Sequence, residues 1–194
     1  VEPTGGANYR PVPDDVGGLA WAGHLLYLSD SAGLRVFDLG NLGRSGTDLV
    51  LPQSGTYARA GLTALGLDAA SSPPALVTAE RGPAGDGDRL VRWPLDGDRL
   101  LPSGGDGETV LAGAAWQSTH RSLAAVAAHG GAFLLAGGTG TEAAVWVEQP
   151  GRPATRLAFP EGVRGLSLLP ATGHLWTATD PPGRRVVVAV PVAL

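Results

Sequence analysis

The 194-residue chain contains no cysteine, methionine, isoleucine or lysine. Without cysteine it can form no disulfide, no thiolate metal site and no thiol nucleophile. All 14 basic residues are therefore arginine, and the formal charge of −4 argues against a general nucleic-acid binder, which needs a basic surface to displace counterions from phosphates. The longest apolar runs, such as 186–191, have only the length of a strand, so none is long enough for a membrane-spanning helix.

What the chain has in excess is turn-forming residues. It contains 30 glycines and 16 prolines, well above average usage, yet 43% of its residues are hydrophobic, which excludes a disordered chain. Short apolar segments between glycine-rich turns are typical of an all-β protein. One segment, 112–128, is rich in alanine and could instead form a helix. We expect a strand there because 122–127 occupies the place of a strand in the repeat described next.

The stretch 17–39 sets a pattern that returns three more times. It reads as a small-residue strand (A, 17–21), an apolar strand ending in an acid (B, 24–30) and a third strand (C, 34–39), joined by tight turns. The later A strands are expected at 63–68, 122–127 and 163–168. The later B strands are expected at 74–80, 132–138 and 174–180, and the later C strands at 89–95, 143–149 and 184–190.

Weaker fourth strands (D) are expected at 48–53, 109–113 and 154–160. The B strands begin at 24, 74, 132 and 174, so they are 50, 58 and 42 residues apart. This spacing fits a four-stranded propeller blade of roughly 40–50 residues. The sequence therefore predicts a single β-propeller domain with about four blades, at 17–53, 63–113, 122–160 and 163–194.

The last blade has no residues left for a fourth strand. Closed propellers commonly complete their last blade with a strand from the N-terminal segment, which removes an exposed edge. We expect Tyr9–Val12, within 8–13, to pair with 184–190 and close a four-bladed ring. The alternative is a five-bladed or larger ring completed by another segment or another chain.

Several segments together resemble an uncharacterised family of exported actinobacterial β-propeller-like proteins. They are LLYLSDSAGLRVFDLGNL, LVLPQSGTY, SSPPALVTAERG, RLVRWPLDGDRL and GVRGLSLLPATGHLWTATDPPGRRVVVAVP. The resemblance covers about 17–191 and implies a propeller fold, export, and a part of a ring larger than four blades, because family members carry further sequence before these motifs. The absence of an initiator methionine likewise suggests a processed or excised product. The resemblance implies no activity.

The candidate functional residues gather at one end of the predicted propeller. In an up-and-down blade, the B–C and D–A connections meet on the same face. Three B strands end there in an acid (Asp30, Glu80 and Asp180), and Arg81 follows the second. These carboxylates could hold a cation such as calcium, or bind a polar ligand together with arginine. The plainer interpretation is that each acid accepts hydrogen bonds from turn N–H groups.

Trp116 and His120 are expected on the same face, in the D–A connection of the third blade. Trp116 could stack against a sugar ring, although tryptophans in this fold commonly pack between blades. Ser118, His120 and Asp30 contain the residue types of a Ser-His-acid triad, but the sequence alone does not bring them together.

These patterns favour a secreted, non-catalytic binding module that presents one propeller face to a protein or carbohydrate partner and needs no resident cofactor. The alternative is a divalent-cation-dependent propeller hydrolase of the lactonase kind, with calcium as its metal. Such enzymes usually use side-chain amides as well as acids. This chain has two asparagines, Asn8 and Asn41, and neither stands at the end of a B strand, so the binding hypothesis is favoured.

Overall fold

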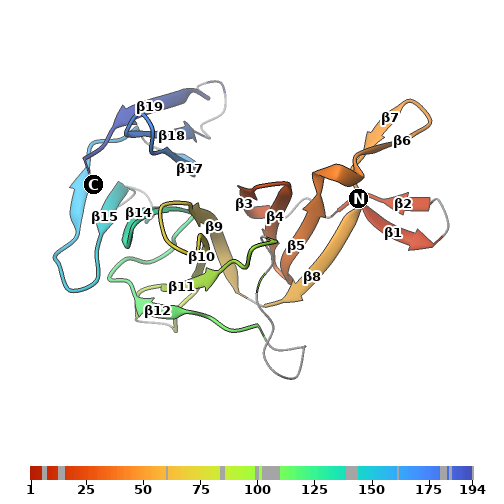
Figure 1. Ribbon diagram of the computed structural model, residues 1–194. Helices are drawn as coiled ribbons and strands as arrows, with labels where there is room; N and C mark the ends of the chain where they lie inside the picture. Colours follow the sequence, from red (N-terminus) through yellow and green to blue (C-terminus); the bar gives the residue numbers. More distant parts are fainter. Residues whose placement is uncertain are drawn as a thin grey trace.

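The computed structural model describes residues 1–5, 8–12, 16–59, 61–83, 86–98, 101, 110–138, 144–160, 162–179, 183 and 185–193. Four small antiparallel sheets are arranged as a four-bladed β-propeller, and two further strand pairs form separate hairpins (Figure 1). The helical content of the described residues is a single 3-10 turn, Leu39–Asn41. No helix in this part of the chain is long and apolar enough to cross a membrane.

Each blade is an up-and-down sheet whose first strand lies innermost. Blade 1 contains β3 (Val16–Ala22), β4 (Leu25–Asp30), β5 (Gly33–Asp38) and β8 (Gln53–Ala58). Blade 2 contains β9 (Leu62–Asp68), β10 (Ala75–Glu80), β11 (Arg89–Pro94) and β12 (Ala114–Gln117). Blade 3 contains β13 (Ala125–His129), β14 (Ala132–Gly137), β15 (Ala144–Glu148) and β16 (Thr155–Leu157). Blade 4 contains β17 (Val163–Leu169), β18 (His174–Thr179) and β19 (Val187–Pro191).

All four blades have A, B and C strands close to the predicted positions, although β13 and β19 each begin three residues later than predicted, whereas the D strands of blades 1 and 2 were misplaced. In blade 1 the fourth strand is β8, not 48–53, because a separate hairpin of β6 (Gly43–Ser45) and β7 (Asp48–Val50) is inserted before it. The hairpin turns at Gly46, whose φ of 62° favours glycine. In blade 2 the fourth strand lies at Ala114–Gln117 rather than 109–113.

The alanine-rich segment forms strands, as expected, and not a helix. The innermost strand of blade 3 is β13, three residues later than the predicted 122–127, because Ser122 has a φ of 53° that no extended strand allows. Its side chains are buried on both faces, which explains its small residues. The neighbouring inner strand approaches so closely that a Cβ on Gly66 would lie 2.2 Å from the carbonyl oxygen of Val126.

The predicted closing strand does not pair with the last blade. The segment Asn8–Arg10 (β2) pairs with Glu2–Gly5 (β1), and this hairpin docks on blade 1. The amide of Gln53 donates to the carbonyl of Val1 (2.8 Å), and the carboxylate of Glu2 binds Arg35. Figure 1 shows the N-terminus and β19 at opposite sides of the molecule. Hydrogen bonds and an ion pair with blade 1 thus hold the segment that the sequence assigned to blade 4.

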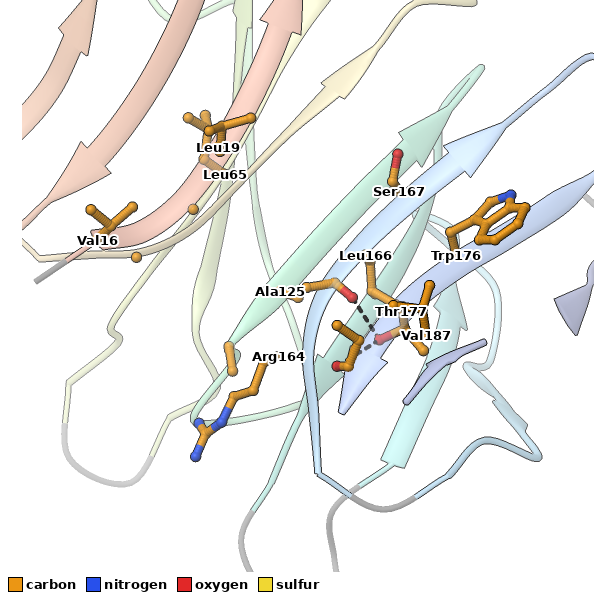
Figure 2. Close-up of a pocket in the computed structure, with 15 residues that line it drawn as sticks. Val16, Leu19, Leu65, Ala125, Arg164, Leu166, Ser167, Trp176, Thr177 and Val187 are labelled. Carbon is orange, nitrogen blue, oxygen red and sulfur yellow. Dashed lines mark hydrogen bonds between the residues drawn. The ribbon is translucent and has the colours of Figure 1, made fainter. Parts of the chain in front are cut away.

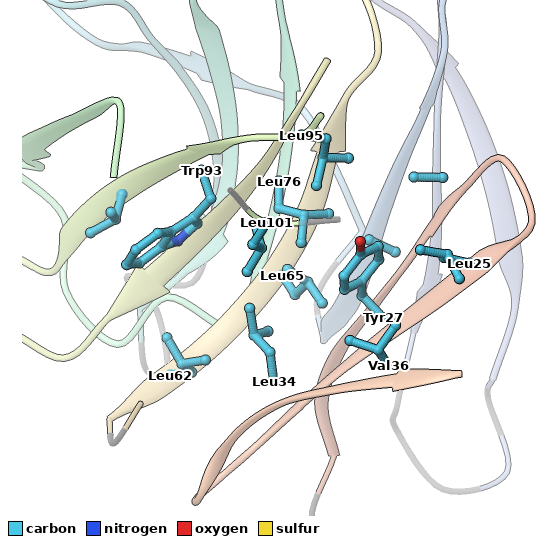
Figure 3. Packing of buried hydrophobic residues seen from close by; sticks show 13 residues of the cluster. Leu25, Tyr27, Leu34, Val36, Leu62, Leu65, Leu76, Trp93, Leu95 and Leu101 are labelled. Atoms are coloured by element: carbon cyan, nitrogen blue, oxygen red, sulfur yellow. The ribbon is translucent and has the colours of Figure 1, made fainter. Parts of the chain in front are cut away.

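Three apolar clusters lie between consecutive blades and form the core. The first joins blades 1 and 2 around Tyr27, Leu76 and Trp93 (Figure 3). The second joins blades 2 and 3, and the third joins blades 3 and 4. Burying a leucine or phenylalanine side chain contributes roughly 1.5–3 kcal/mol, so these blade-to-blade contacts are the main source of stability. They also fix the inner strands around a central space.

Candidate functional site: the central channel and its mouth

An open cavity of about 390 Å³, called the channel below, lies among the inner strands of the four blades and extends along blade 4 to Trp176 of β18 and Val187 of β19. Figure 2 shows Leu19 of blade 1 and Leu65 of blade 2 on one side of it, and Leu166 and Trp176 of blade 4 on the other. Glycines lie between these side chains on the inner strands, which leaves the space open. The interior of the channel is therefore lined mainly by apolar groups contributed by all four blades.

A second cavity, of about 510 Å³, forms the mouth of this channel at the end where the B–C and D–A connections meet. Gly17, Ala124 and Arg164 line both cavities, so the two spaces adjoin. The mouth is more polar than the interior, because Asp30 and Arg81 lie in its wall. Two of the residues that the sequence selected are thus brought together at the predicted end of the channel.

The carboxylate of Asp30 is fully engaged by its own blade. Its Oδ1 accepts hydrogen bonds from the turn N–H groups of Ala32 (2.8 Å) and Gly33 (3.0 Å), and its Oδ2 binds the guanidinium of Arg35. Burial raises the pKa of Asp30, but the hydrogen bonds from Arg35 and the turn outweigh burial and hold this pKa below its ordinary value. The turn-capping interpretation therefore describes Asp30, with an arginine added.

Glu80 does not line the mouth cavity. Its carboxylate instead links blade 1 to blade 2 through ion pairs. Arg59, which follows the last strand of blade 1, donates from Nε and Nη2 to the two carboxylate oxygens, each at 2.8 Å. Arg89, directly opposite Glu80 on β11, donates to Oε2 from Nε at 3.0 Å and also from Nη2. Burial raises the pKa of Glu80, but the two arginines lower it by more than burial raises it. The pKa of Glu80 therefore lies below its ordinary value, and the carboxyl stays ionised.

These ion pairs bear on the calcium hypothesis. Asp30 and Glu80 already have arginine as their counter-charge, which leaves little negative charge for a cation. Asp180, the third proposed ligand, lies outside the described residues. In the part of the chain that the structure describes, no group of three histidine or acidic residues is arranged to hold a metal ion.

Arg81 is an exposed charge at the mouth. Its backbone N–H donates to the carbonyl of Gly61 (3.1 Å), which fixes the start of the connection that carries it. Its side chain lines the cavity, and no ion pair of Arg81 is found among the described residues. Arg164 at the start of β17 lines the same cavity. With Asp30 neutralised by Arg35, the described wall of the mouth is suited to a polar or anionic group.

Trp116 lies away from the mouth, in a groove on the rim between blades 2 and 3. This groove has a volume of about 350 Å³ and includes Glu148 and Arg152 of blade 3. The indole of Trp116 is half-buried and packs against Phe133, with ring centroids 5.0 Å apart and planes at 59°. The buried part of the Trp116 indole thus packs between blades 2 and 3, and its exposed part faces the groove.

His120 belongs to a small polar cluster that holds the connection before β13. Its ring stacks on Trp146 with centroids 4.0 Å apart, and its Nε2 lies 3.9 Å from Oε2 of Glu148. Burial lowers the pKa of His120, and the Glu148 carboxylate opposes this effect only in part. His120 is therefore neutral near pH 7.

The cluster does not have the geometry of a nucleophilic triad. The hydroxyl of Ser118 donates directly to Glu148 (2.8 Å) and accepts from the backbone N–H of His120 (3.0 Å). A catalytic histidine would lie between the serine and the acid. Ser118 is moreover buried, and Asp30 lines a different cavity, so the three residue types noted in the sequence do not form a reaction centre.

The sequence analysis did not identify the arginines that pair with Asp30 and Glu80, nor two of the residues that line the mouth. Arg35 and Arg89 stand on C strands, next to the strand that each acid terminates, so cross-strand charge pairing could have identified them. Arg59 and Arg164 reach their places only through the arrangement of neighbouring blades, and Ser122 lines the mouth in its strained conformation. No sequence pattern marks these three.

Comparisons with known proteins add little to this picture. No family model and no curated protein matches the chain. Among solved structures, it is similar to the crystal structure of the computationally designed Ika4 protein, with 14% sequence identity, coverage of 96% of this chain and 95% of that chain, and a TM-score of 0.40.

Proposed function

We propose that this protein is a secreted, non-catalytic binding module that presents the mouth of its channel to a protein or carbohydrate partner. The proposal continues the interpretation of the sequence, in which chemically varied residues gather on connections at one end of a rigid apolar scaffold. The geometry of the mouth supports it in the following way.

The observation that carries the proposal is the contrast between Arg81 and the nearby acids. Asp30 and Glu80 are held by arginines, whereas the guanidinium of Arg81 is exposed at a cavity of about 510 Å³. A planar guanidinium donates hydrogen bonds equally well to a carboxylate of a protein and to the hydroxyl or carboxylate groups of a sugar. The described part of the mouth thus offers hydrogen-bond donors for recognition.

The test is a binding screen with matched variants. The purified chain is assayed against a glycan array that includes acidic sugars and against candidate extracellular proteins. Binding is expected to be lost in Arg81→Ala and retained in the control Arg44→Ala, which removes an exposed arginine from the β6–β7 hairpin. Loss in Trp116→Ala but not in Arg81→Ala would move the contact to the rim groove.

Turnover is assayed in parallel, on lactone and ester substrates with and without calcium. The expected result is no turnover above the rate without protein. Calcium-dependent turnover that Glu80→Gln abolishes would overturn the binding proposal in favour of the hydrolase.

A further inference from the structure

The groove on the rim between blades 2 and 3 contains recognition groups of its own. None of the residues that the structure places along this groove of about 350 Å³ also lines the mouth of the channel. The buried side chains of Leu90 and Phe133 give the groove an apolar base, and Trp116, Glu148 and Arg152 line it as well. An apolar hollow with a few polar groups around it is the usual form of a small-molecule site.

The indole of Trp116 is the flat apolar surface of this groove. Trp116 stands opposite Leu90 in the ladder between β11 and β12, and its ring packs against Phe133. Both neighbours are buried, so they hold the indole in one position while part of it stays exposed to the groove. A fixed, partly exposed aromatic ring gives a large contact area at low entropic cost, and the apolar face of a sugar ring can stack on it.

Glu148 brings a carboxylate to the groove that lacks a cationic partner among the described residues. Asp30 and Glu80 are each held by arginine, whereas the carboxylate of Glu148 accepts one hydrogen bond within the described part of the chain, from the hydroxyl of Ser118 (2.8 Å). His120 lies 3.9 Å away but is neutral near pH 7. The side chain of Glu148 is only 13% exposed, and a carboxylate can accept about four hydrogen bonds. It therefore favours a ligand that donates hydrogen bonds.

Arg152 supplies donors at the same groove from a rigid turn. Its amide donates to the carbonyl of Gln149 (3.0 Å), and Pro150 and Gly151 stand between them. The φ of Gly151 is 78°, which suits the third position of a type II turn, and proline is common at the second position. The guanidinium of Arg152 makes no hydrogen bond or ion pair with the described residues. Its donors are therefore available, and the turn that carries them is ordered before any ligand binds.

We propose that the rim groove binds a neutral sugar residue of a glycan, at a site separate from the mouth. The ring of the sugar stacks on Trp116, and its hydroxyl groups donate to Glu148 and accept from Arg152. A sugar hydroxyl both donates and accepts, so neighbouring hydroxyls match a carboxylate and a guanidinium together. The mouth, with the exposed Arg81, suits an acidic group instead.

A proline-rich peptide is the main competitor for this groove, because proline also stacks on aromatic side chains. The sugar is favoured because of Glu148. Proline has no N–H, so a proline-rich backbone presents chiefly carbonyl acceptors and would cover the carboxylate without donating to it.

The test begins with an array of neutral glycans, followed by calorimetric titration with the methyl glycoside of the sugar that responds. Trp116→Ala should abolish measurable binding, because it removes the stacking surface. Glu148→Gln should weaken binding about five- to tenfold, because a neutral amide oxygen is a poorer acceptor than a carboxylate. Arg152→Ala should weaken binding several-fold. This residue is exposed on a turn, so its variant tests the site even if Trp116→Ala does not fold.

Matched controls remove the same side chains elsewhere. Trp21→Ala on blade 1 and Arg156→Ala on β16 each delete an exposed side chain outside the groove, and both should bind as the unchanged chain does. Circular dichroism verifies that each variant is folded. In the unchanged chain, NMR titration with the same glycoside should shift the indole N–H of Trp116 and the backbone amides of 149, 151 and 152, and leave the amide of Arg81 unaffected.

Three results would overturn the rim site. They are the absence of binding by any neutral glycan, binding that persists unchanged in folded Trp116→Ala and in Arg152→Ala, and displacement of the glycoside by a proline-rich peptide that binds more tightly. Neutral-sugar binding that is lost in Arg81→Ala but kept in Trp116→Ala would also overturn it, and would support the mouth. The converse result supports the rim site, and acidic sugars and proteins then test the mouth independently.

Discussion

The two inner strands of blades 2 and 3 are buried on both faces, whereas those of blade 4 are buried mainly on one. The second strands of blades 2 and 3, β10 and β14, are buried at every position, but β18 alternates between buried and exposed residues. The sequences of β10 (ALVTAE) and β18 (HLWTAT) are similar in character and share a Thr-Ala pair. Burial of a strand in this fold is therefore decided by how many blades pack against its sheet.

Blade 1 shows the same effect on its other side. Leu19 and Trp21 of β3 point away from blade 2 and are 56% and 61% exposed. The outer half of this face is covered by the β1–β2 hairpin, where Glu2 meets Arg35. The two ends of the blade array thus carry apolar side chains that lack the neighbouring blade available to every interior face.

The largest expected difference is between a buried and an exposed leucine. Leu76→Ala, inside the cluster between blades 1 and 2, should lower the free energy of unfolding by about 3 kcal/mol, because it leaves a cavity among packed side chains. Leu19→Ala, on the bare face of blade 1, should change it by less than about 0.5 kcal/mol. Urea denaturation of both variants measures this. Equal costs would show that the face of blade 1 is covered in solution.

Glu80→Gln tests the ion pairs that join blades 1 and 2. We expect a loss of about 2 kcal/mol, because Arg59 and Arg89 lose a buried counter-charge, moderated by the partial exposure of both arginines. The control Asp48→Asn, on an exposed hairpin strand, should have no measurable effect. Urea denaturation at pH 7 gives both values, and a neutral result for Glu80→Gln would mean that the blades are held by apolar contacts alone.

The ion pairs of Glu80 also predict that the stability of the protein depends on pH. The pKa of Glu80 is lowered in the folded state, so its stabilising contribution is present above the ordinary value of 4.5 and is lost as pH falls through the lower folded value. The difference in stability between the chain and Glu80→Gln should therefore be constant from pH 7 to pH 5 and shrink below pH 4.5. A difference that persists at the lowest pH at which the chain folds would contradict this linkage.

Two tryptophans, Trp93 and Trp176, allow an interior blade to be compared with a terminal blade through the same substitution, with a smaller expected effect. Trp93→Phe should cost about 1–2 kcal/mol, because the buried hydroxyl of Thr78 loses the indole N–H that donates to it at 2.9 Å. Trp176→Phe, on the bare face of blade 4, should be neutral within about 0.5 kcal/mol. Thermal unfolding of the two variants compares an interior with a terminal blade for the same substitution, and a larger loss for Trp176→Phe would reverse the comparison.

The smallest effect is expected at His120. Its pKa is lowered by burial, so the unfolded chain binds the proton more readily and stability should fall as pH decreases through the ordinary value of 6.5. His120→Phe keeps an aromatic ring for stacking on Trp146 and should remove this dependence. Denaturation at pH 7.5 and pH 5.5 provides the comparison. An unchanged pH dependence in the variant would assign it to other groups.

Much of the fold was predictable because glycine-rich turns separate strands of regular length. The A, B and C strands follow from that pattern, and even the alanine-rich 125–129 could be assigned by its place in the repeat. The fourth strands were harder to predict because they are short and polar, and because the hairpin 43–50 resembles a strand. Tyr9–Val12 was misplaced because a strand pattern does not reveal which edge it pairs with.

For the candidate site, the sequence determined which residue types stand at the end of each B strand, since side-chain alternation and turns are local properties. Asp30 and Arg81 accordingly lie at the predicted mouth. Only the tertiary structure decided that Arg59 crosses from blade 1 to Glu80 and that Trp116 lies on the rim. Such contacts depend on how separate blades pack and twist against one another, and that arrangement is not a local property of any one strand.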